Sequence, residues 1–267
     1  MLNIIVCKLY KVDFVRRIVR AFQSNFPFLR EAQAEGKRLL QRFSRIPFEA
    51  DFKALALIPI PEKALFLDVG ANRGLSAEAI LMYAKSARVH LFEPNPLVSK
   101  KLARRYGRSP QMEVFQCGLG DTAEERTLYV PFYKGWMFDA LASFDRKEAA
   151  EWLEGQIAGY RREHLRIQEY PCFIKRIDDM GLAPFFIKLD VQGHELAVLR
   201  GAEQTLRDYG PIILLEVLSP AARSFVSPMG YAPYAFRSGR FYAGEEGELN
   251  TFLLPPDKRA LVEPYLA

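Results

Sequence analysis

From about residue 61 onward, short apolar runs alternate with stretches whose apolar residues recur at helical spacing. The runs predict strands at 64–69, 88–92, 112–117, 185–189 and 212–217, and the stretches between them predict helices at 75–86, 96–106 and 194–208. Shorter runs at 234–237 and 251–254 indicate antiparallel edge strands. Because near-continuous apolar strands that alternate with helices are typical of a parallel sheet covered on both faces, the pattern predicts an α/β fold.

The stretch between the third and fourth of these strands departs from the alternation. Residues 128–131 indicate a strand, and residues 132–170 form an insert rich in aromatic and charged residues, with a helix expected from 146 to about 160. Inserts at the ligand end of an α/β sheet often determine substrate choice. The alternative is a surface helix that only packs against the domain.

A different pattern precedes residue 61. Residues 3–23 place apolar side chains at helical spacing with arginines between them, and a second helix is expected at about 29–45. We therefore divide the chain into an N-terminal basic helical segment, residues 1–60, and a main domain, residues 61–267. The two helices either cap the main domain or make a peripheral contact, through residues 1–24, with an anionic membrane or a partner.

The distribution of charge supports this division. The 267 residues carry a net charge of +5. Residues 1–60 contain 11 Lys and Arg against 5 Asp and Glu, whereas residues 61–267 contain 26 against 27. We therefore do not expect the main domain to present a cationic surface to a polyanion such as a nucleic acid.

Cysteine and histidine are sparse. The three cysteines are far apart and form no C-x-x-C pair, which argues against a disulfide framework or a structural zinc site and favours a reducing compartment. Three histidines are too few for a histidine-rich metal cluster. No run approaches 18 apolar residues, and basic residues follow the first apolar run, so we expect neither a membrane span nor a secretory signal and place the protein in the cytoplasm.

A glycine-rich turn follows the first predicted strand. In the segment LFLDVGANRGLS, Asp68 ends the strand, and Gly70 and Gly74 lie in the turn into the next helix. Ligands of open α/β sheets bind beyond the carboxyl ends of the strands, and glycines allow a close approach of the backbone. The G-x-x-x-G spacing differs from the dinucleotide fingerprint, and no Lys-Ser/Thr pair follows, which excludes a P-loop. With Asp68 beside it, the turn indicates a nucleoside-type ligand; a plain strand–helix turn is the alternative.

Acidic residues also follow the next two strands. Glu93 ends the second strand in the segment FEPNP, where a carboxylate can accept hydrogen bonds from both ribose hydroxyls. The alternative is a charge at a helix N-terminus, since Pro96 suits a first helical turn. Asp121, in the segment GLGD, follows the third strand, where it either faces an adenine or belongs to an ordinary turn.

Together with two later segments, these motifs make the chain resemble a known family. The later segments are IKLDVQGHEL, which contains Asp190, His194 and Glu195, and PIILLE, which ends in Glu216. In this order and spacing they resemble the FkbM family of S-adenosylmethionine-dependent methyltransferases, over about residues 64–256 without the insert. One position departs from the family pattern, because Gln192 stands where an acidic residue is usual.

The resemblance implies a class I methyltransferase fold, in which a mostly parallel, seven-stranded sheet with helices on both faces binds S-adenosylmethionine across its first strands. By position, the glycine turn would surround the amino-acid and ribose parts of the cofactor, Glu93 would accept from the ribose hydroxyls, and Asp121 would lie near the adenine. The cofactor-binding residues implied in this way are Asp68, Gly70, Ala71, Asn72, Gly74, Glu93, Pro94, Asn95, Gly118 and Asp121.

Family members are associated with O-methylation, and a hydroxyl at neutral pH needs a proton acceptor or a metal ion to become a good nucleophile. Two assignments remain open. In the first, His194 is the general base and Asp190 or Glu195 holds its ring. In the second, Asp190 and Glu216 hold Mg²⁺, which lowers the pKa of the hydroxyl. The structural alternative is that His194 and Glu195 only organise the loop and the start of the following helix.

Three other functions share parts of these patterns. An NAD-type oxidoreductase has the strand-end acid but another glycine fingerprint. A nucleic-acid methyltransferase that modifies amino groups has an Asp/Asn-Pro-Pro-aromatic segment where this chain has DVQG. A non-catalytic protein on the same fold would bind no cofactor. We therefore expect a small-molecule or carbohydrate acceptor, with its hydroxyl on a sugar, glycan, glycolipid or secondary metabolite, and no nucleic-acid partner.

Overall fold

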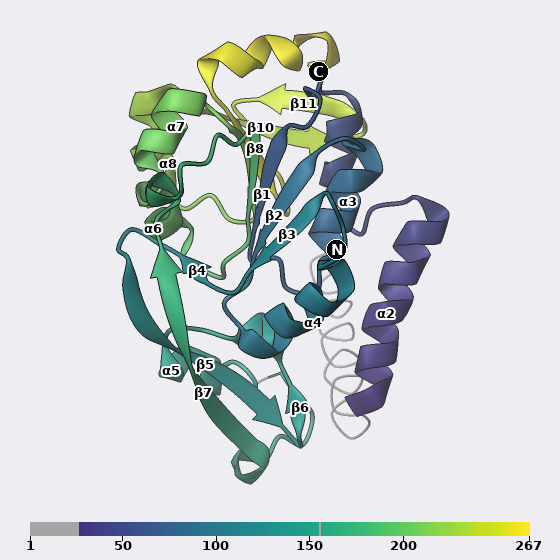
Figure 1. Ribbon diagram of the computed structural model, residues 1–267, viewed down its shortest axis with the longest axis vertical. Coiled ribbons are helices and arrows are strands. Elements are labelled where there is room, and N and C mark those ends of the chain that lie inside the picture. The colour runs from purple at the N-terminus through teal and green to yellow at the C-terminus, as the bar shows by residue number, and fades with distance from the viewer. Residues whose placement is uncertain (1–26, 155) are drawn as a thin grey trace, which may run out of the picture. The chain divides into compact units, whose positions relative to one another are not determined.

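The computed structural model describes residues 27–154 and 156–267, with side chains from residue 35 onward (Figure 1). The basic helix expected at 3–23 lies outside the described residues. Helix α2 (Pro27–Ser44) confirms the second helix expected near the N-terminus. None of the described helices combines the length and the apolar character that crossing a membrane requires.

The chain divides into two units. Among the described residues, the larger unit comprises residues 40–126 and 172–267, and the smaller one comprises residues 27–39, 127–154 and 156–171. The boundary that the sequence suggests at residue 60 stays a prediction.

The larger unit is built on an eight-stranded sheet in the order β11-β10-β12-β9-β8-β1-β2-β3. Strands β3, β2, β1, β8 and β9 are parallel, whereas β12 is antiparallel to β9 and β10 is antiparallel to β12. The bounds are β1 Leu65–Val69, β2 Arg88–Phe92, β3 Met112–Phe115, β8 Phe186–Leu189, β9 Ile212–Leu215, β10 Ala232–Arg237, β11 Arg240–Ala243 and β12 Thr251–Leu254. The α/β fold of the class I methyltransferase type is thereby confirmed.

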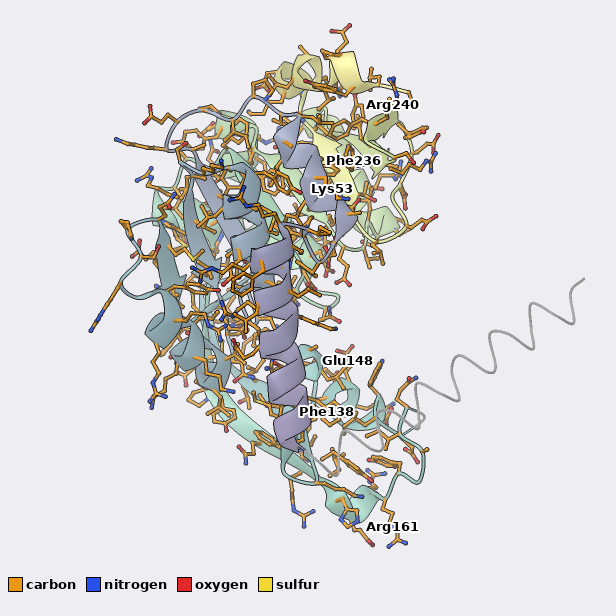
Figure 2. The ribbon with its side chains drawn as sticks, turned by 90° about the vertical axis from the view of Figure 1, so that its right-hand side faces the viewer. Lys53, Phe138, Glu148, Arg161, Phe236 and Arg240 are labelled. Atoms are coloured by element: carbon orange, nitrogen blue, oxygen red, sulfur yellow. The ribbon has the colours of Figure 1, made fainter. Side chains whose placement is uncertain are left out.

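The described part of this sheet has eight strands and not the expected seven. The additional strand is β11, which pairs antiparallel with β10. Ser238 and Gly239 both have positive φ, at 53° and 77°, which is the geometry of a tight hairpin turn. This turn returns the chain beside β10, where Phe236 packs on Phe241 with ring centroids 5.0 Å apart (Figure 2).

The helices of the larger unit follow the predicted order. They are α3 Leu75–Tyr83, α4 Pro96–Tyr106, α6 Glu195–Arg200, α7 Glu203–Tyr209 and α8 Pro220–Val226, with shorter 3₁₀ helices η1 Ala50–Ala56, η4 Ile177–Met180, η5 Ser227–Met229, η6 Pro256–Leu261 and η7 Glu263–Tyr265. The single helix expected at 194–208 is wrong, because it breaks between α6 and α7. At the break, a Cβ on Gly201 would lie 1.8 Å from the carbonyl oxygen of Gly120, so the chain passes too close for a side chain.

The smaller unit holds the insert. Strand β5 (Glu124–Tyr133) extends the short strand expected at 128–131 and pairs with β6 (Trp136–Met137), and helix α5 (Arg146–Glu151) ends well before residue 160. Strand β7 (Leu165–Lys175) was not predicted. Its residues 174–175 already belong to the larger unit, where they pair with β4 (Gly118–Leu119). Short helices η2 Asp139–Leu141 and η3 Arg162–His164 complete it.

Aromatic residues of the insert form the core of the smaller unit. Tyr133 and Phe138 are buried there with Leu153 and Ile157, and Figure 2 labels Phe138. Tyr133 stacks on Tyr160 with ring centroids 5.2 Å apart. These two aromatic side chains therefore stabilise the insert itself.

Gly70 lies where three strands of the larger unit end. Its φ is +81°, and a Cβ at this position would lie 1.8 Å from the carbonyl oxygen of Asp190. The amides of Gly70 and Ala71 both donate to the carbonyl oxygen of Phe92, at 3.0 and 3.1 Å. The turn after β1 is thus joined to the end of β2 and lies against the backbone after β8.

We expect Gly70→Ala to lower the free energy of unfolding by about 3 kcal/mol or more, because the added methyl group clashes with a backbone oxygen in addition to the left-handed strain. Gly239→Ala is the matched control, since Gly239 has φ +77° and no atom within 4 Å of an added Cβ. It should cost only about 1–2 kcal/mol of backbone strain. Urea unfolding of both variants tests the difference, and equal losses would contradict the close approach.

Candidate active site

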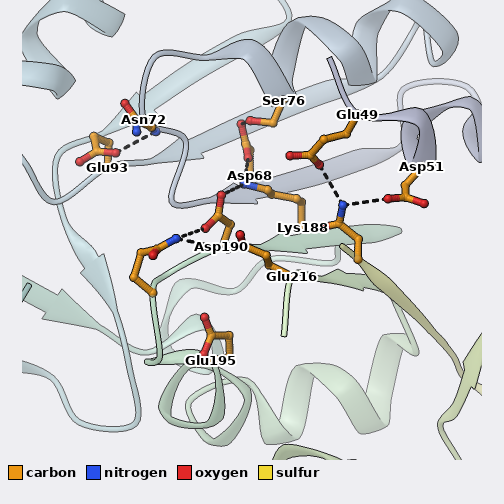
Figure 3. A network of polar contacts seen from close by, with 12 residues as sticks. Glu49, Asp51, Asp68, Asn72, Ser76, Glu93, Lys188, Asp190, Glu195 and Glu216 are labelled. Atoms are coloured by element: carbon orange, nitrogen blue, oxygen red, sulfur yellow. Dashed lines mark hydrogen bonds and ion pairs between the residues drawn. The ribbon is translucent and has the colours of Figure 1, made fainter. Parts of the chain in front are cut away.

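A lysine is buried at the centre of the sheet. Lys188 is only 3% exposed within the apolar strand β8. Its Nζ lies 3.0 Å from Oδ2 of Asp190 and 3.9 Å from Oδ1 of Asp68, which is fully buried at the end of β1 (Figure 3). The Ser76 hydroxyl donates to the other oxygen of Asp68 at 2.6 Å. The ends of β1 and β8 and the start of α3 therefore meet around one cation.

The charges in this cluster depend on one another. Burial raises the pKa of Asp68, and Lys188 and the Ser76 hydrogen bond oppose that shift. Burial alone would lower the pKa of Lys188, but attraction to Asp68 and Asp190 raises it above its ordinary value. We therefore take Lys188 as protonated and held between two carboxylates.

We expect Lys188→Met to reduce the free energy of unfolding by about 3–5 kcal/mol, because removing one partner leaves the buried Asp68 carboxylate without compensation. The double variant Lys188→Met/Asp68→Asn should recover part of that loss, since it also removes the charge that was left unpaired. Chemical denaturation of both single variants and of the double variant at neutral pH measures this recovery. A double variant whose loss equals the sum of the two single losses would show that the pair is not coupled.

A second group of polar side chains lies beyond the strand ends. Nε2 of Gln192 donates to Oδ1 of Asp190 at 2.9 Å and to Oε2 of Glu216 at 3.2 Å. Gln192 has a φ of 53° and Gly193 has a φ of 92°, so the chain turns sharply after β8 and the amide points back toward both carboxyl groups. The family usually has an acidic residue at position 192, and an ionised carboxylate there could not donate these two hydrogen bonds. Gln192 therefore makes contacts that the usual acidic residue could not make.

Asp190 and Glu216 titrate as a pair. Their mutual hydrogen bond, followed by burial and repulsion from the Asp190 charge, raises the pKa of Glu216 to about 8. Burial acts to raise the pKa of Asp190, but Lys188 and the hydrogen bond from Glu216 outweigh it and lower that pKa. At neutral pH, Asp190 is therefore the carboxylate and Glu216 the carboxylic acid that donates to it.

This pairing makes the stability dependent on pH. Because the Glu216 pKa rises from its ordinary 4.5 to about 8 in the folded protein, the folded state binds more protons than the unfolded state between these values. The resulting stabilisation is complete below pH 4.5 and is lost as the pH rises through about 8. The wild type should therefore lose stability relative to Glu216→Gln between about pH 5 and 8.5, as measured by urea unfolding at several pH values.

Glu62→Gln, a change at an exposed residue, serves as the control for this pH series. Its stability should change with pH in parallel with the wild type. If the stability of Glu216→Gln also changes with pH in parallel with the wild type, Glu216 does not hold a proton beside Asp190 at neutral pH.

Glu93 occupies the end of β2 and is almost fully buried. Its two carboxylate oxygens accept hydrogen bonds from the backbone amides of Asn72 and Asn95, both at 2.8 Å. Pro94 lies between these contacts in the chain, and Asn95 caps α4 by accepting from the amide of Leu97. Because a carboxylate has about four lone-pair positions, it can accept from backbone amides and from ligand hydroxyls at the same time.

The glycine turn supplies a further polar atom. Asn72 has a φ of 43°, and its Oδ1 is buried and has no hydrogen-bond partner within the described part of the chain. Gly74, with φ +81°, begins α3. An acceptor atom of this kind, beside the Glu93 carboxylate and a glycine turn, fits a ligand that carries hydroxyl and amino groups.

His194 immediately precedes α6. Burial, followed by the Arg126 charge, lowers the pKa of its imidazole, and the acidic groups that face it are Asp121, Glu195 and Glu124. Gly118 lies in β4, and Asp121 is exposed just after it. His194 and Asp190, the two predicted catalytic residues, thus have different charged neighbours. Neutral imidazole at pH 7 is the form that accepts a proton.

Glu195 is buried, and its carboxylate accepts from the amide of Gly193 at 3.0 Å. This contact holds the turn before α6. Within the described residues, no group of three or more His, Cys, Asp or Glu side chains is arranged to hold a metal ion. The arrangement gives the Mg²⁺ hypothesis for Asp190 and Glu216 no support.

Residues far apart in the sequence complete the cluster. Asn250 is buried, and its Nδ2 donates to Oε2 of Glu49 and Oδ2 of Asp51, both at 2.9 Å; Figure 3 labels the two acidic partners. Burial raises the pKa of Glu49, while Asn250 and Lys188 oppose the shift, so Glu49 interacts with the same charges as Asp190. Sequence reasoning assigned no role to Glu49, Asp51 or Lys188. Of these three, only Lys188 could have been found from the sequence, because it is the one charged residue in an apolar strand.

Comparison with known proteins assigns the family. The model of the methyltransferase FkbM domain matches residues 68–232. Over 182 residues the chain is 34% identical to the AMB antimetabolite synthetase AmbE of Pseudomonas aeruginosa. The match covers 60% of this chain and 9% of AmbE. Over 165 residues the chain is 27% identical to the 2-O-methyltransferase NoeI of Sinorhizobium fredii. That match covers 57% of this chain and 62% of NoeI. The chain thus spans less than two thirds of either relative.

A solved structure is also similar. The crystal structure of methyltransferase FkbM from Methylobacillus flagellatus KT aligns with a TM-score of 0.47 at 17% identity, over 78% of this chain and 47% of that one. The family model covers more than half of the chain. The chain therefore belongs to the methyltransferase FkbM domain family.

Proposed function

We propose that this chain is an S-adenosylmethionine-dependent O-methyltransferase whose acceptor is a hydroxyl on a sugar, glycan, glycolipid or secondary metabolite. The observation that carries the proposal is the Glu93 carboxylate, held by two backbone amides beside the glycine turn at the ends of β1 and β2. Ribose hydroxyls require an acceptor of this kind at this end of an α/β sheet. Membership of a methyltransferase family supports this interpretation over a nicotinamide oxidoreductase.

When bound, the cofactor supplies a methyl group to the acceptor oxygen as its sulfur–methyl bond breaks. The protein must hold the acceptor in line and take its proton. We assign the proton acceptor to His194, whose imidazole is neutral at pH 7. Asp190, Gln192 and Glu216 then position the acceptor, because they combine a carboxylate, an amide and a carboxylic acid at one place.

The name of one relative supports transfer to oxygen. NoeI is called a 2-O-methyltransferase, and it is 27% identical to this chain over 165 residues. Clustered carboxyl and amide groups suit an acceptor with several hydroxyls, since each group can bind a neighbouring pair. A polyhydroxylated acceptor is therefore our first choice.

The proposal is tested by titration with S-adenosylhomocysteine and by methyl transfer to a panel of sugars and glycolipids. Glu93→Gln should weaken binding about tenfold or more, since it removes the charge that accepts the ribose hydrogen bonds. His194→Ala should leave binding nearly unchanged and lower turnover by about two orders of magnitude. Glu113→Gln, at an exposed residue of β3, is the control and should change neither quantity.

Three outcomes would contradict the proposal. Binding of NADH without S-adenosylhomocysteine would reverse the choice of cofactor. Unchanged turnover in His194→Ala would remove the base. Activity that disappears with a chelator and returns with Mg²⁺ would favour the metal assignment over the general base.

A further inference from the structure

Apolar side chains are exposed at the end of α2 and in the segment that follows. Leu40 is 67% exposed, Phe43 82%, Ile46 59% and Phe48 43%. Arg42 and Arg45, which alternate with them, are exposed as well. We call these six residues the α2 patch. Four large apolar side chains within nine residues are too many for ordinary exposed surface, and such groups mark an interaction site.

The chain is held so that these side chains stay outside. Gln41 is 3% exposed, and its Nε2 donates to the carbonyl oxygen of Leu75 at 3.0 Å. Its Oε1 accepts from the amide of Phe48 at 2.7 Å. One buried side chain therefore ties both ends of the α2 patch to the start of α3, and the apolar groups are presented on an anchored segment.

The charge of the segment identifies the partner. Arg42 and Arg45 are the charged residues of the α2 patch, and the patch contains no acidic residue. A second copy is a poor partner, because a two-fold dimer through this patch would place four arginines in one interface with no acidic residue of the patch to pair with them. An anionic bilayer surface offers apolar depth for the leucine, isoleucine and phenylalanines and phosphates for the arginines.

We propose that the α2 patch docks the protein on the surface of an anionic membrane, with Leu40, Phe43 and Ile46 entering the interface and Arg42 and Arg45 contacting lipid phosphates. Phe48 is followed directly by Glu49, which belongs to the polar cluster of the candidate site. Docking would therefore bring that cluster close to the lipid headgroups. The proposal concerns attachment alone and does not depend on the proposed methyl transfer.

Sedimentation with vesicles of phosphatidylcholine, with and without phosphatidylglycerol, tests the proposal on the full chain. The wild type should bind only the anionic vesicles and should be released by salt. Phe43→Ser/Ile46→Ser and Arg42→Glu/Arg45→Glu should each lower the partition coefficient at least about tenfold. The first variant removes apolar side chains that enter the interface, and the second reverses the charge that attracts anionic lipid. The controls are Tyr209→Ser, an aromatic residue 48% exposed on α7, and Lys100→Glu/Arg104→Glu on α4.

The outcomes separate the alternatives. Loss of binding in the patch variants, with the controls unchanged and unfolding curves like the wild type, supports the proposal. A wild type that binds no vesicles overturns it, as do patch variants that bind normally while deletion of residues 1–24 abolishes binding. Light scattering that shows a dimer which the patch variants dissociate would instead make the patch a contact between copies.

Discussion

The arrangement of the candidate site depends on one buried positive charge. An ammonium group inside an apolar strand is stable only when carboxylates offset its lost hydration, and an isolated buried ion would cost several kcal/mol. Asp68 and Asp190 flank Lys188 and provide that compensation. Because these carboxylates lie near the ends of two adjacent parallel strands, the charge also links the ends of β1 and β8. The glycine turn can then lie directly against the backbone after β8.

The same charge gives different states to two carboxyl groups at the strand ends. Asp190 contacts Lys188 directly and stays ionised. Glu216 keeps its proton and donates a hydrogen bond to Asp190. Gln192 reaches both groups with an amide donor. A carboxylate, a carboxylic acid and an amide therefore lie together, which gives the site both donors and acceptors for a neutral polar acceptor.

The sheet could be predicted from the sequence because parallel strands are buried on both faces and therefore appear as apolar runs. The strand-end motifs could be predicted as well, since Asp68, Glu93 and Asp190 each follow such a run. The contacts of Lys188 could not, because its partners come from another strand and from the turn beyond its own. Asn250 and Glu49 are 201 residues apart, and no local pattern connects them. Strand β7 was missed because it contains Pro171 and several polar residues, which argue against a strand in sequence analysis.

The most direct test of this account is a crystal structure of the protein with S-adenosylhomocysteine. The account predicts that both ribose hydroxyls lie within about 3 Å of the Glu93 carboxylate, that the amino-acid part lies along the glycine turn, and that the sulfur faces the carboxyl groups of Asp190 and Glu216. A ligand bound elsewhere, or a ribose without contact to Glu93, would contradict it.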